Sequence, residues 1–397
     1  MGLFYFGVKM NLNIIPHTKR QFTFGPFLFE NGEILNKITI TYETWGKLNE
    51  NRDNVVLIAH ALTGTSHAAS AYDSPEKGWW ESLIGPGKSI DTEKYFVICP
   101  NVIGGCSGSS GPNTINEDTG LPYGVEFPIV TIKDMVRSQK KLIDQLQISQ
   151  LLTITGASMG GMQAMEWAAQ YPEMVKSIIP ISAPGRAYPQ SIAYRKSQRK
   201  AIMNDPDWNG GNYYGLSKPN KGIELARLIG FITYRSEQEF AERFGRDHRD
   251  SSLFDLNARF EIESYLEHHG KKLAQWFDAN TYLYLSKSMD LHDLGRGYNS
   301  YEEGIRQIQA HTLCIGVDSD ILFPNYQQKE FVNILSQTNP NATYKEIKSL
   351  YGHDAFLIEE VQINSIITEF LTNIESKNEE KELEISNKSY SCGNSTG

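Results

Sequence analysis

The part of the sequence that first points to chemistry is a serine in a glycine-rich turn. Gly156-Ala157-Ser158-Met159-Gly160 fits the pattern Gly-x-Ser-x-Gly. An apolar, β-branched run at residues 151–155 precedes the turn, and a helix-like segment at residues 161–169 follows it. A strand, a sharp turn and a helix in this order are typical of a nucleophile elbow, which lifts the serine hydroxyl above the sheet edge. We therefore predict that Ser158 is a nucleophile, while the five-residue pattern alone leaves open a tight turn with an idle serine.

A serine nucleophile needs a base that takes its proton and an acid that orients the base. In this fold class both follow the serine in the chain, in loops after late strands. His353 follows the predicted strand 343–347 and comes directly after a glycine. Asp318 and Asp320 follow the predicted strand 312–316, and spacing alone does not choose between them. Several other histidines lie in or beside a helical segment, where packing or solvent exposure is the plainer explanation: His248, His268, His269, His292 and His311.

The oxyanion that forms during acyl transfer needs two N–H donors. One is expected from Met159, the residue after the nucleophile, and the other from the loop after an early central strand. Here the continuously apolar run 55–59 ends in His60-Ala61-Leu62-Thr63-Gly64. An ordinary connecting loop is the alternative, but the elbow favours the functional interpretation.

The elements that must position these residues alternate between strands and helices. Residues 55–59 are apolar throughout, as expected for a central strand that is buried on both faces, and residues 131–146 have the spacing of an amphipathic helix. Further strands are predicted at residues 38–42, 95–99 (stopped by Pro100), 151–155 and 177–182. This alternation predicts a parallel sheet with helices on both faces.

The pattern changes after Pro184. Residues 185–309 contain no strong strand, and helices are predicted at residues 222–234, 257–269 and 271–287. Strands resume at 312–316 and 343–347, and residues 361–374 read as a closing helix. We expect a core at 14–184 and 310–374, a helical lid at 185–309, an N-terminal extension at 1–13 in which Met10 could be an alternative start, and a disordered, Lys/Glu/Ser/Asn-rich tail at 375–397.

Composition narrows the class of protein. The chain has 397 residues, 40% hydrophobic and 21% charged, with a net charge of −9. That charge argues against nucleic acid or an acidic membrane surface as the main partner, although it allows a local basic pocket. No apolar run is long enough to span a bilayer. The four cysteines, Cys99, Cys106, Cys314 and Cys392, form no zinc or disulfide pattern, and free thiols fit a reducing cytoplasm.

Several segments between about residues 14 and 372 add a more specific signal. They are residues 60–64, 101–108, 127–136, 158–163, Ala226-Arg227 ahead of 232–234, 316–320 and 352–357. In their order and content they resemble the homoserine O-acetyltransferase family of α/β-hydrolase-fold acyltransferases. The first dozen residues and the tail after Glu375 lie outside the resemblance.

The resemblance implies a role for particular residues. It makes Asp320 the catalytic acid, and it places the substrate amine against Asp354 and the substrate carboxylate against Arg227. These roles are physically sensible, because a zwitterionic amino acid needs one anion and one cation across its pocket, and arginine binds a carboxylate bidentately. Without the resemblance, Arg227 would be interpreted as a surface ion-pair residue on an amphipathic helix.

The resemblance also implies a reaction. Ser158, activated by His353, takes an acetyl group from acetyl-CoA while the N–H groups of Leu62 and Met159 hold the oxyanion, and L-homoserine then accepts the group. This is a ping-pong reaction of methionine biosynthesis, in a cytoplasmic homodimer built through the lid, with no permanently bound cofactor and no metal. The open alternatives are a succinyl-CoA donor, an L-serine acceptor, an esterase or peptidase, and, more remotely, a non-catalytic binding module.

Overall fold

The computed structural model describes residues 19–70, 76–250 and 253–393. The predicted N-terminal extension at 1–13 and Met10 lie outside the described residues. Within the described part of the chain, no helix is long and apolar enough to cross a membrane.

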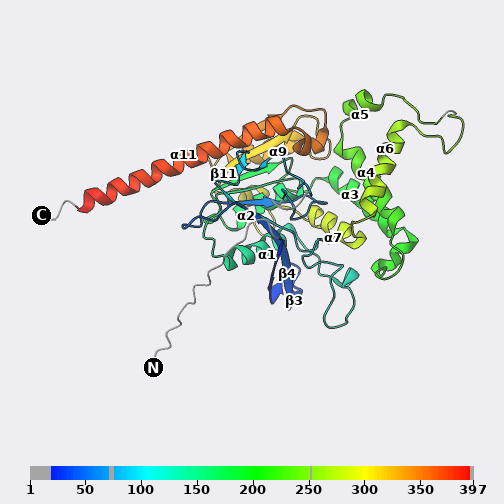
Figure 1. The fold of residues 1–397 in the computed structure, drawn as a ribbon, viewed down its shortest axis with the longest axis horizontal. Coiled ribbons are helices and arrows are strands. Elements are labelled where there is room, and N and C mark those ends of the chain that lie inside the picture. The colour runs from blue at the N-terminus through cyan, green and yellow to red at the C-terminus, as the bar shows by residue number, and fades with distance from the viewer. Residues whose placement is uncertain (1–18, 71–75, 251–252, 394–397) are drawn as a thin grey trace.

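The centre of the molecule is an eight-stranded, mostly parallel sheet, as the sequence predicted (Figure 1). Its strands, in spatial order, are β1 (Arg20–Phe24), β4 (Ile38–Trp45), β8 (Phe96–Pro100), β5 (Val55–Ala59), β9 (Thr153–Ala157), β10 (Ser177–Ile181), β11 (His311–Val317) and β12 (Ala342–Ile347). Among the described strands of this sheet, only the pairs β1–β4 and β4–β8 are antiparallel. The strand predicted at 95–99 is β8, shifted by one residue. Pro100 is the last residue of this strand and pairs with Tyr42 of β4. Two small ribbons, β2 (Phe27–Leu28) with β3 (Ile34–Leu35) and β6 (Ile84–Gly85) with β7 (Ile90–Asp91), lie outside the sheet.

Both faces of the sheet are covered, and strand β5 shows this directly. Val55, Leu57 and Ala59 belong to one apolar cluster, whereas Val56 and Ile58 belong to the other. The first cluster includes α1 (Ile132–Gln145), α2 (Met159–Gln170) and α9 (Asn325–Leu335), and the second includes α11 (Glu360–Gly393). The continuous apolar run predicted a strand buried on both sides, and the two clusters confirm it.

Helix limits follow their capping residues. The predicted helix 131–146 is α1, whose N-cap Thr131 forms a capping box with Asp134. The predicted helix 222–234 is α4 (Asn220–Tyr234). The predicted helices 257–269 and 271–287 have wrong limits: the chain forms α6 (Glu261–Ala274) and, after a break, α7 (Ala279–Asp290). Asp278 sets the second start, because its side chain accepts a hydrogen bond from the Thr281 N–H.

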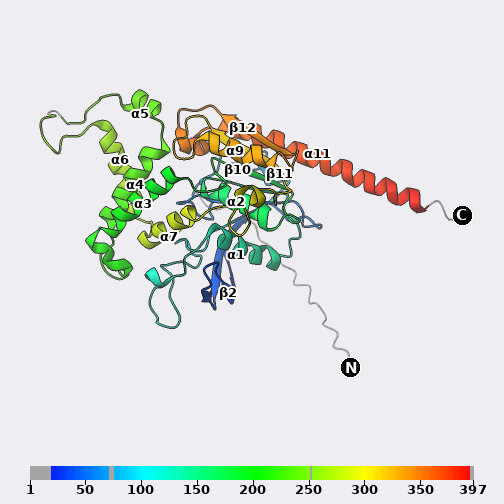
Figure 2. The ribbon, with the colours of Figure 1, turned by 180° about the vertical axis from the view of Figure 1, so that it is seen from behind.

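The segment between β10 and β11, which the sequence predicts as a lid, is largely helical. It contains α3 (Pro189–Met203), the 3₁₀ segment η2 (Pro206–Gly211), α4, α5 (Glu237–Phe244), α6, α7 and α8 (Tyr301–Ile305), and its described residues form only isolated β-bridges. Helices α3 to α6 project from one side of the core, opposite the end of α11, in both views (Figures 1 and 2). In the chain, these helices follow β10, the first strand after the elbow.

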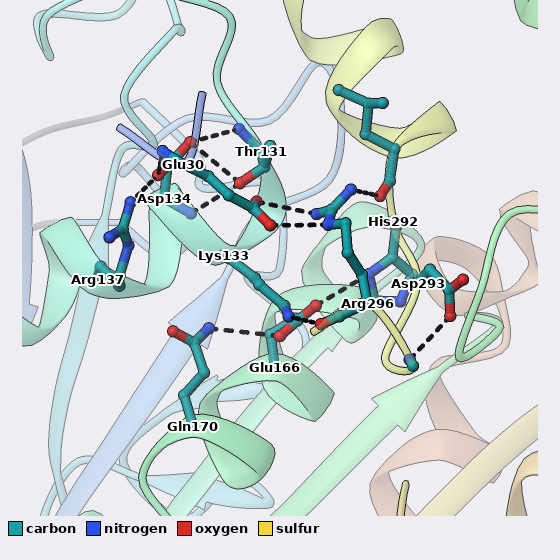
Figure 3. A network of polar contacts seen from close by, with 12 residues as sticks. Glu30, Thr131, Lys133, Asp134, Arg137, Glu166, Gln170, His292, Asp293 and Arg296 are labelled. Atoms are coloured by element: carbon teal, nitrogen blue, oxygen red, sulfur yellow. Dashed lines mark hydrogen bonds and ion pairs between the residues drawn. The ribbon is translucent and has the colours of Figure 1, made fainter. Parts of the chain in front are cut away.

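A network of polar contacts fixes the chain where it returns from the lid to the core (Figure 3). Arg296 forms an ion pair with Glu30 through Nε and Nη2, at 2.7 and 3.0 Å. Lys133 of α1 donates a hydrogen bond to the carbonyl of Arg296. His292 lies 3.6 Å from Glu166 of α2, and both side chains are buried. These contacts tie the lid's return segment to two core helices.

The closing helix is longer than predicted. Helix α11 covers the expected residues 361–374, where Ile363, Ile367 and Leu371 pack in the core. Its backbone stays helical to Gly393, so the disorder expected after residue 375 does not match residues 375–393 in the structure (Figure 2). Lysine and glutamate have a high helix propensity, so the composition that suggested disorder also suits a helix.

Candidate active site

Ser158 stands at the turn between β9 and α2 in a strained conformation. Its φ and ψ are 56° and −121°, outside the regions that L-residues normally occupy. Such strain is typical of a nucleophile elbow. The flanking glycines are required by space, since a Cβ on Gly156 or Gly160 would lie 2.3 or 2.0 Å from the carbonyl oxygen of Ala59. β5 therefore approaches the elbow too closely for any side chain at these two positions.

His353 lies at the expected loop and is held by a carboxylate. It belongs to the 3₁₀ turn Gly352–Asp354, and its Nδ1 is 2.7 Å from Oδ2 of Asp320. The other oxygen of Asp320 accepts hydrogen bonds from the N–H groups of Leu322 and Phe323, each at 2.9 Å. Burial alone would lower the pKa of His353, but the Asp320 carboxylate, helped by Asp354, outweighs burial and raises it.

The two candidate acids occupy different environments. Asp320 is buried against His353. Asp318 is exposed, accepts a hydrogen bond from the Ser349 N–H at 3.0 Å, and lies 3.5 Å from Lys348. The structure therefore pairs His353 with Asp320, and Asp318 caps a surface turn.

Most of the predicted site residues line one cavity of about 360 Å³. Ser158, His353, Leu62, Arg227 and Asp354 all contribute to its wall. Asp320 lies behind His353, and Met159 is the buried first residue of α2. Residues from the loop after β5, the elbow, the lid and the last strand loop thus meet, in a volume suited to a small-molecule ligand.

Arg227 reaches the cavity from α4 of the lid. Its guanidinium lies over the rings of Phe231 and Tyr234, 4.5 and 5.3 Å from their centroids. Among the residues whose side chains the structure describes, no carboxylate lies within 4.0 Å of it in an ion pair. Aromatic stacking holds the side chain while leaving its charge available for an anion.

Asp354 has a partner that the sequence did not reveal. Nε of Arg235, the residue after α4, lies 3.3 Å from its Oδ2. Burial raises the pKa of Asp354, while Arg235, His353 and Arg227 offset part of the effect. Arg235 gave no signal in the sequence because this ion pair joins positions more than a hundred residues apart.

The cavity is positively charged although the chain as a whole is acidic. Arg195 and Lys272 line it together with Arg227. His269 also lines the cavity, and its pKa is lowered to about 4 by burial, by Arg227 and by Lys272. Asp290 binds Arg195 at 2.6 Å and also holds Arg199. The excess positive charge favours anionic ligands.

Comparison with known proteins decides the family. The α/β-hydrolase fold model matches residues 54–360. Homoserine O-acetyltransferase from Deferribacter desulfuricans is 51% identical over 355 residues, which cover 88% of this chain and 94% of the relative. The chain belongs to the homoserine O-acetyltransferase family.

Solved structures agree with this family. The homoserine O-acetyltransferase from Bacillus anthracis superposes with a TM-score of 0.85 at 32% identity, covering 90% of this chain and 98% of that one. Esterase E22 superposes with a TM-score of 0.82 at 31% identity, covering 89% and 99%. Because a transferase and an esterase share this fold, the fold alone does not separate transfer from hydrolysis.

Proposed function

We propose that this enzyme transfers the acetyl group of acetyl-CoA to the side-chain hydroxyl of L-homoserine, through an acetyl-Ser158 intermediate. The observation that carries the proposal is a cavity in which a serine at a strained elbow meets a histidine–aspartate pair and an arginine that forms no ion pair with any described carboxylate. The roughly 50% identity to curated homoserine O-acetyltransferases supports the choice of substrates.

The first half-reaction acylates the serine. His353 takes the Ser158 proton, and the serine oxygen attacks the thioester carbonyl. The N–H groups of Leu62 and Met159 stabilise the oxyanion, and the thiolate of coenzyme A leaves with the proton from His353. Asp320 holds the Nδ1–H of His353, so that Nε2 is the nitrogen that accepts the proton.

The second half-reaction needs an oriented amino acid. Arg227 binds the homoserine carboxylate, and Asp354 binds its ammonium group. His353 then takes the hydroxyl proton, and the hydroxyl oxygen attacks the acetyl-enzyme to release O-acetylhomoserine and restore Ser158. The cations along the cavity also suit the phosphates of coenzyme A.

Hydrolysis is the second candidate, because esterase E22 has the same fold at 31% identity. Steady-state kinetics with acetyl- or succinyl-CoA and homoserine or serine, each with a water-only control, test both candidates. We expect acetyl-CoA with homoserine to give the highest kcat/KM. Equal coenzyme A release with and without homoserine would favour an esterase.

We also propose a cytoplasmic homodimer that associates through the lid. Leu225 and Ile232, seven residues apart on one side of α4, are each 50% exposed, and such residues favour an interface. Cys99, Cys106 and Cys314 are free thiols, in keeping with a reducing compartment. Light scattering should give a dimer for the native enzyme and a monomer for Leu225→Glu with Ile232→Glu.

A further inference from the structure

Gln163 is a completely buried polar residue that the proposed mechanism does not use. It lies in α2, four residues after Met159, and its side chain is 0% exposed. A buried amide is costly unless its donors and acceptor are satisfied. The partners of Gln163 therefore indicate what the residue is for.

Its amide nitrogen donates to two carbonyls on different segments. One is the carbonyl of His60, at 3.2 Å, in the loop after β5. The other is the carbonyl of Met159, at 3.3 Å, at the start of α2. An amide nitrogen carries two hydrogens, so these two carbonyls use its full donor capacity. These are the segments expected to supply the two oxyanion donors, Leu62 and Met159.

A second row of buried groups holds Gln163 in this orientation. Nε2 of Gln139, in α1, donates to Oε1 of Gln163 at 2.8 Å. Nε1 of Trp167 donates to Oε1 of Gln139 at 2.8 Å. All three side chains are at most 1% exposed. Because its oxygen is already bonded, the Gln163 amide presents its nitrogen to the two carbonyls.

The loop itself is fixed by its own histidine. Ring Nε2 of His60 accepts a hydrogen bond from the Val102 N–H at 3.0 Å, so Nδ1 carries the proton and donates to the Ala61 carbonyl at 2.8 Å. That carbonyl belongs to the same peptide unit as the Leu62 N–H. In a trans peptide the two groups point in opposite directions, so holding one carbonyl sets the direction of the N–H.

We propose that Gln163 is a positioning residue that links the two walls of the oxyanion hole, by bonding the His60 carbonyl of the loop and the Met159 carbonyl of the elbow helix. The inference rests on the proposed acyl transfer through Ser158. Gln163 touches no substrate; it keeps the Leu62 and Met159 peptides at a fixed separation. Oxyanion donors act only within a few tenths of an ångström of their best distance, and a misplacement of about 1 Å can cost about 10²-fold in rate.

The test is the single-turnover rate at which acetyl-CoA acetylates Ser158, followed by coenzyme A release and intact mass. Gln163→Met keeps the side-chain length but has no donor. We expect its acetylation rate at saturating acetyl-CoA to fall about 10²-fold, with the half-saturating concentration and the pH dependence unchanged. Gln139→Met removes the group that orients Gln163, and it also removes the acceptor of the Trp167 indole N–H; it should slow acetylation about tenfold.

Thr153→Val is the matched control. Thr153 is also 0% exposed and bonds Ser177, but at the end of β9 away from the elbow. It should lower the unfolding temperature and leave the acetylation rate unchanged. A folded Gln163→Met enzyme that acetylates as fast as this control would overturn the inference. If Gln163→Met does not fold, a native rate in Gln139→Met overturns it instead. Failure of the native enzyme to form acetyl-Ser158 would refute the proposed function itself, a different result.

Discussion

Replacing Asp320 with asparagine should disable the enzyme by changing which nitrogen of His353 carries the proton. One oxygen of Asp320 accepts two backbone N–H groups, from Leu322 and Phe323, at 2.9 Å each. In Asp320→Asn the amide oxygen must keep that place, because an NH₂ group there would face two donors. The NH₂ group is therefore turned toward Nδ1 of His353, 2.7 Å away in the native enzyme.

An NH₂ group at that position forces Nδ1 to act as an acceptor. The proton then moves to Nε2, which can no longer take the proton of Ser158. Enforcing the wrong tautomer costs about 10⁴-fold in kcat in a serine triad, equivalent to about 5.5 kcal/mol of transition-state stabilisation. Because asparagine has the same size and keeps both backbone hydrogen bonds, the fold should be retained.

Stopped-flow measurement of coenzyme A release, with circular dichroism to check folding, gives the assay. Asp318→Asn is the matched control, since Asp318 is exposed and bonds the Ser349 N–H and Lys348 instead. We expect this control to keep kcat within about threefold, as surface ion pairs contribute little. A crippled Asp318→Asn enzyme beside a nearly native Asp320→Asn enzyme would refute the assignment of the acid.

Three further predictions concern the same cavity. Ser158→Ala incubated with acetyl-CoA should show no added acetyl group by intact-protein mass spectrometry, whereas the native enzyme should gain one; an equal adduct on the variant would exclude Ser158 as the nucleophile. Arg227→Ala should release a first equivalent of coenzyme A normally but lose about 30-fold or more in kcat/KM for homoserine, because removing one partner of a desolvated charged contact costs about 2–5 kcal/mol; loss of the burst with an unchanged KM for homoserine would place Arg227 elsewhere. The acylation rate should fall as the pH drops through the pKa of His353, which Asp320 raises against the opposing effect of burial. In Asp320→Asn burial dominates and lowers the His353 pKa, so the residual rate of this variant should persist to lower pH. An acid limb of the pH–rate profile at the same pH in both enzymes would contradict the effect of Asp320 on the His353 pKa.

Local patterns in the sequence predicted the elbow and seven of the eight strands of the sheet, all except β1, although β9 lies two residues later than predicted. Strands β5 and β10 were predicted within one residue of their limits, because a run of apolar, β-branched residues between polar turns has few other stable environments. The elbow was predictable because only glycine fits beside the Ala59 carbonyl, so the sequence must carry glycine at positions 156 and 160. Helix limits in the lid were less predictable, since α6 ends at Ala274 and α7 starts only after Asp278, whose side chain caps it.

Only the tertiary structure decided which side chains meet. Asp318 and Asp320 are equivalent in spacing, and the direction of the loop after β11 brings Asp320 alone to His353. The ion pair of Arg235 with Asp354 joins the lid to the last strand loop, and the two bonds of Gln163 join α2 to the loop after β5. Contacts of this kind depend on the packing of distant segments, for which local periodicity carries no signal. The sequence by itself thus determined the sheet, the elbow and the types of residue available, while packing selected the partners that orient them.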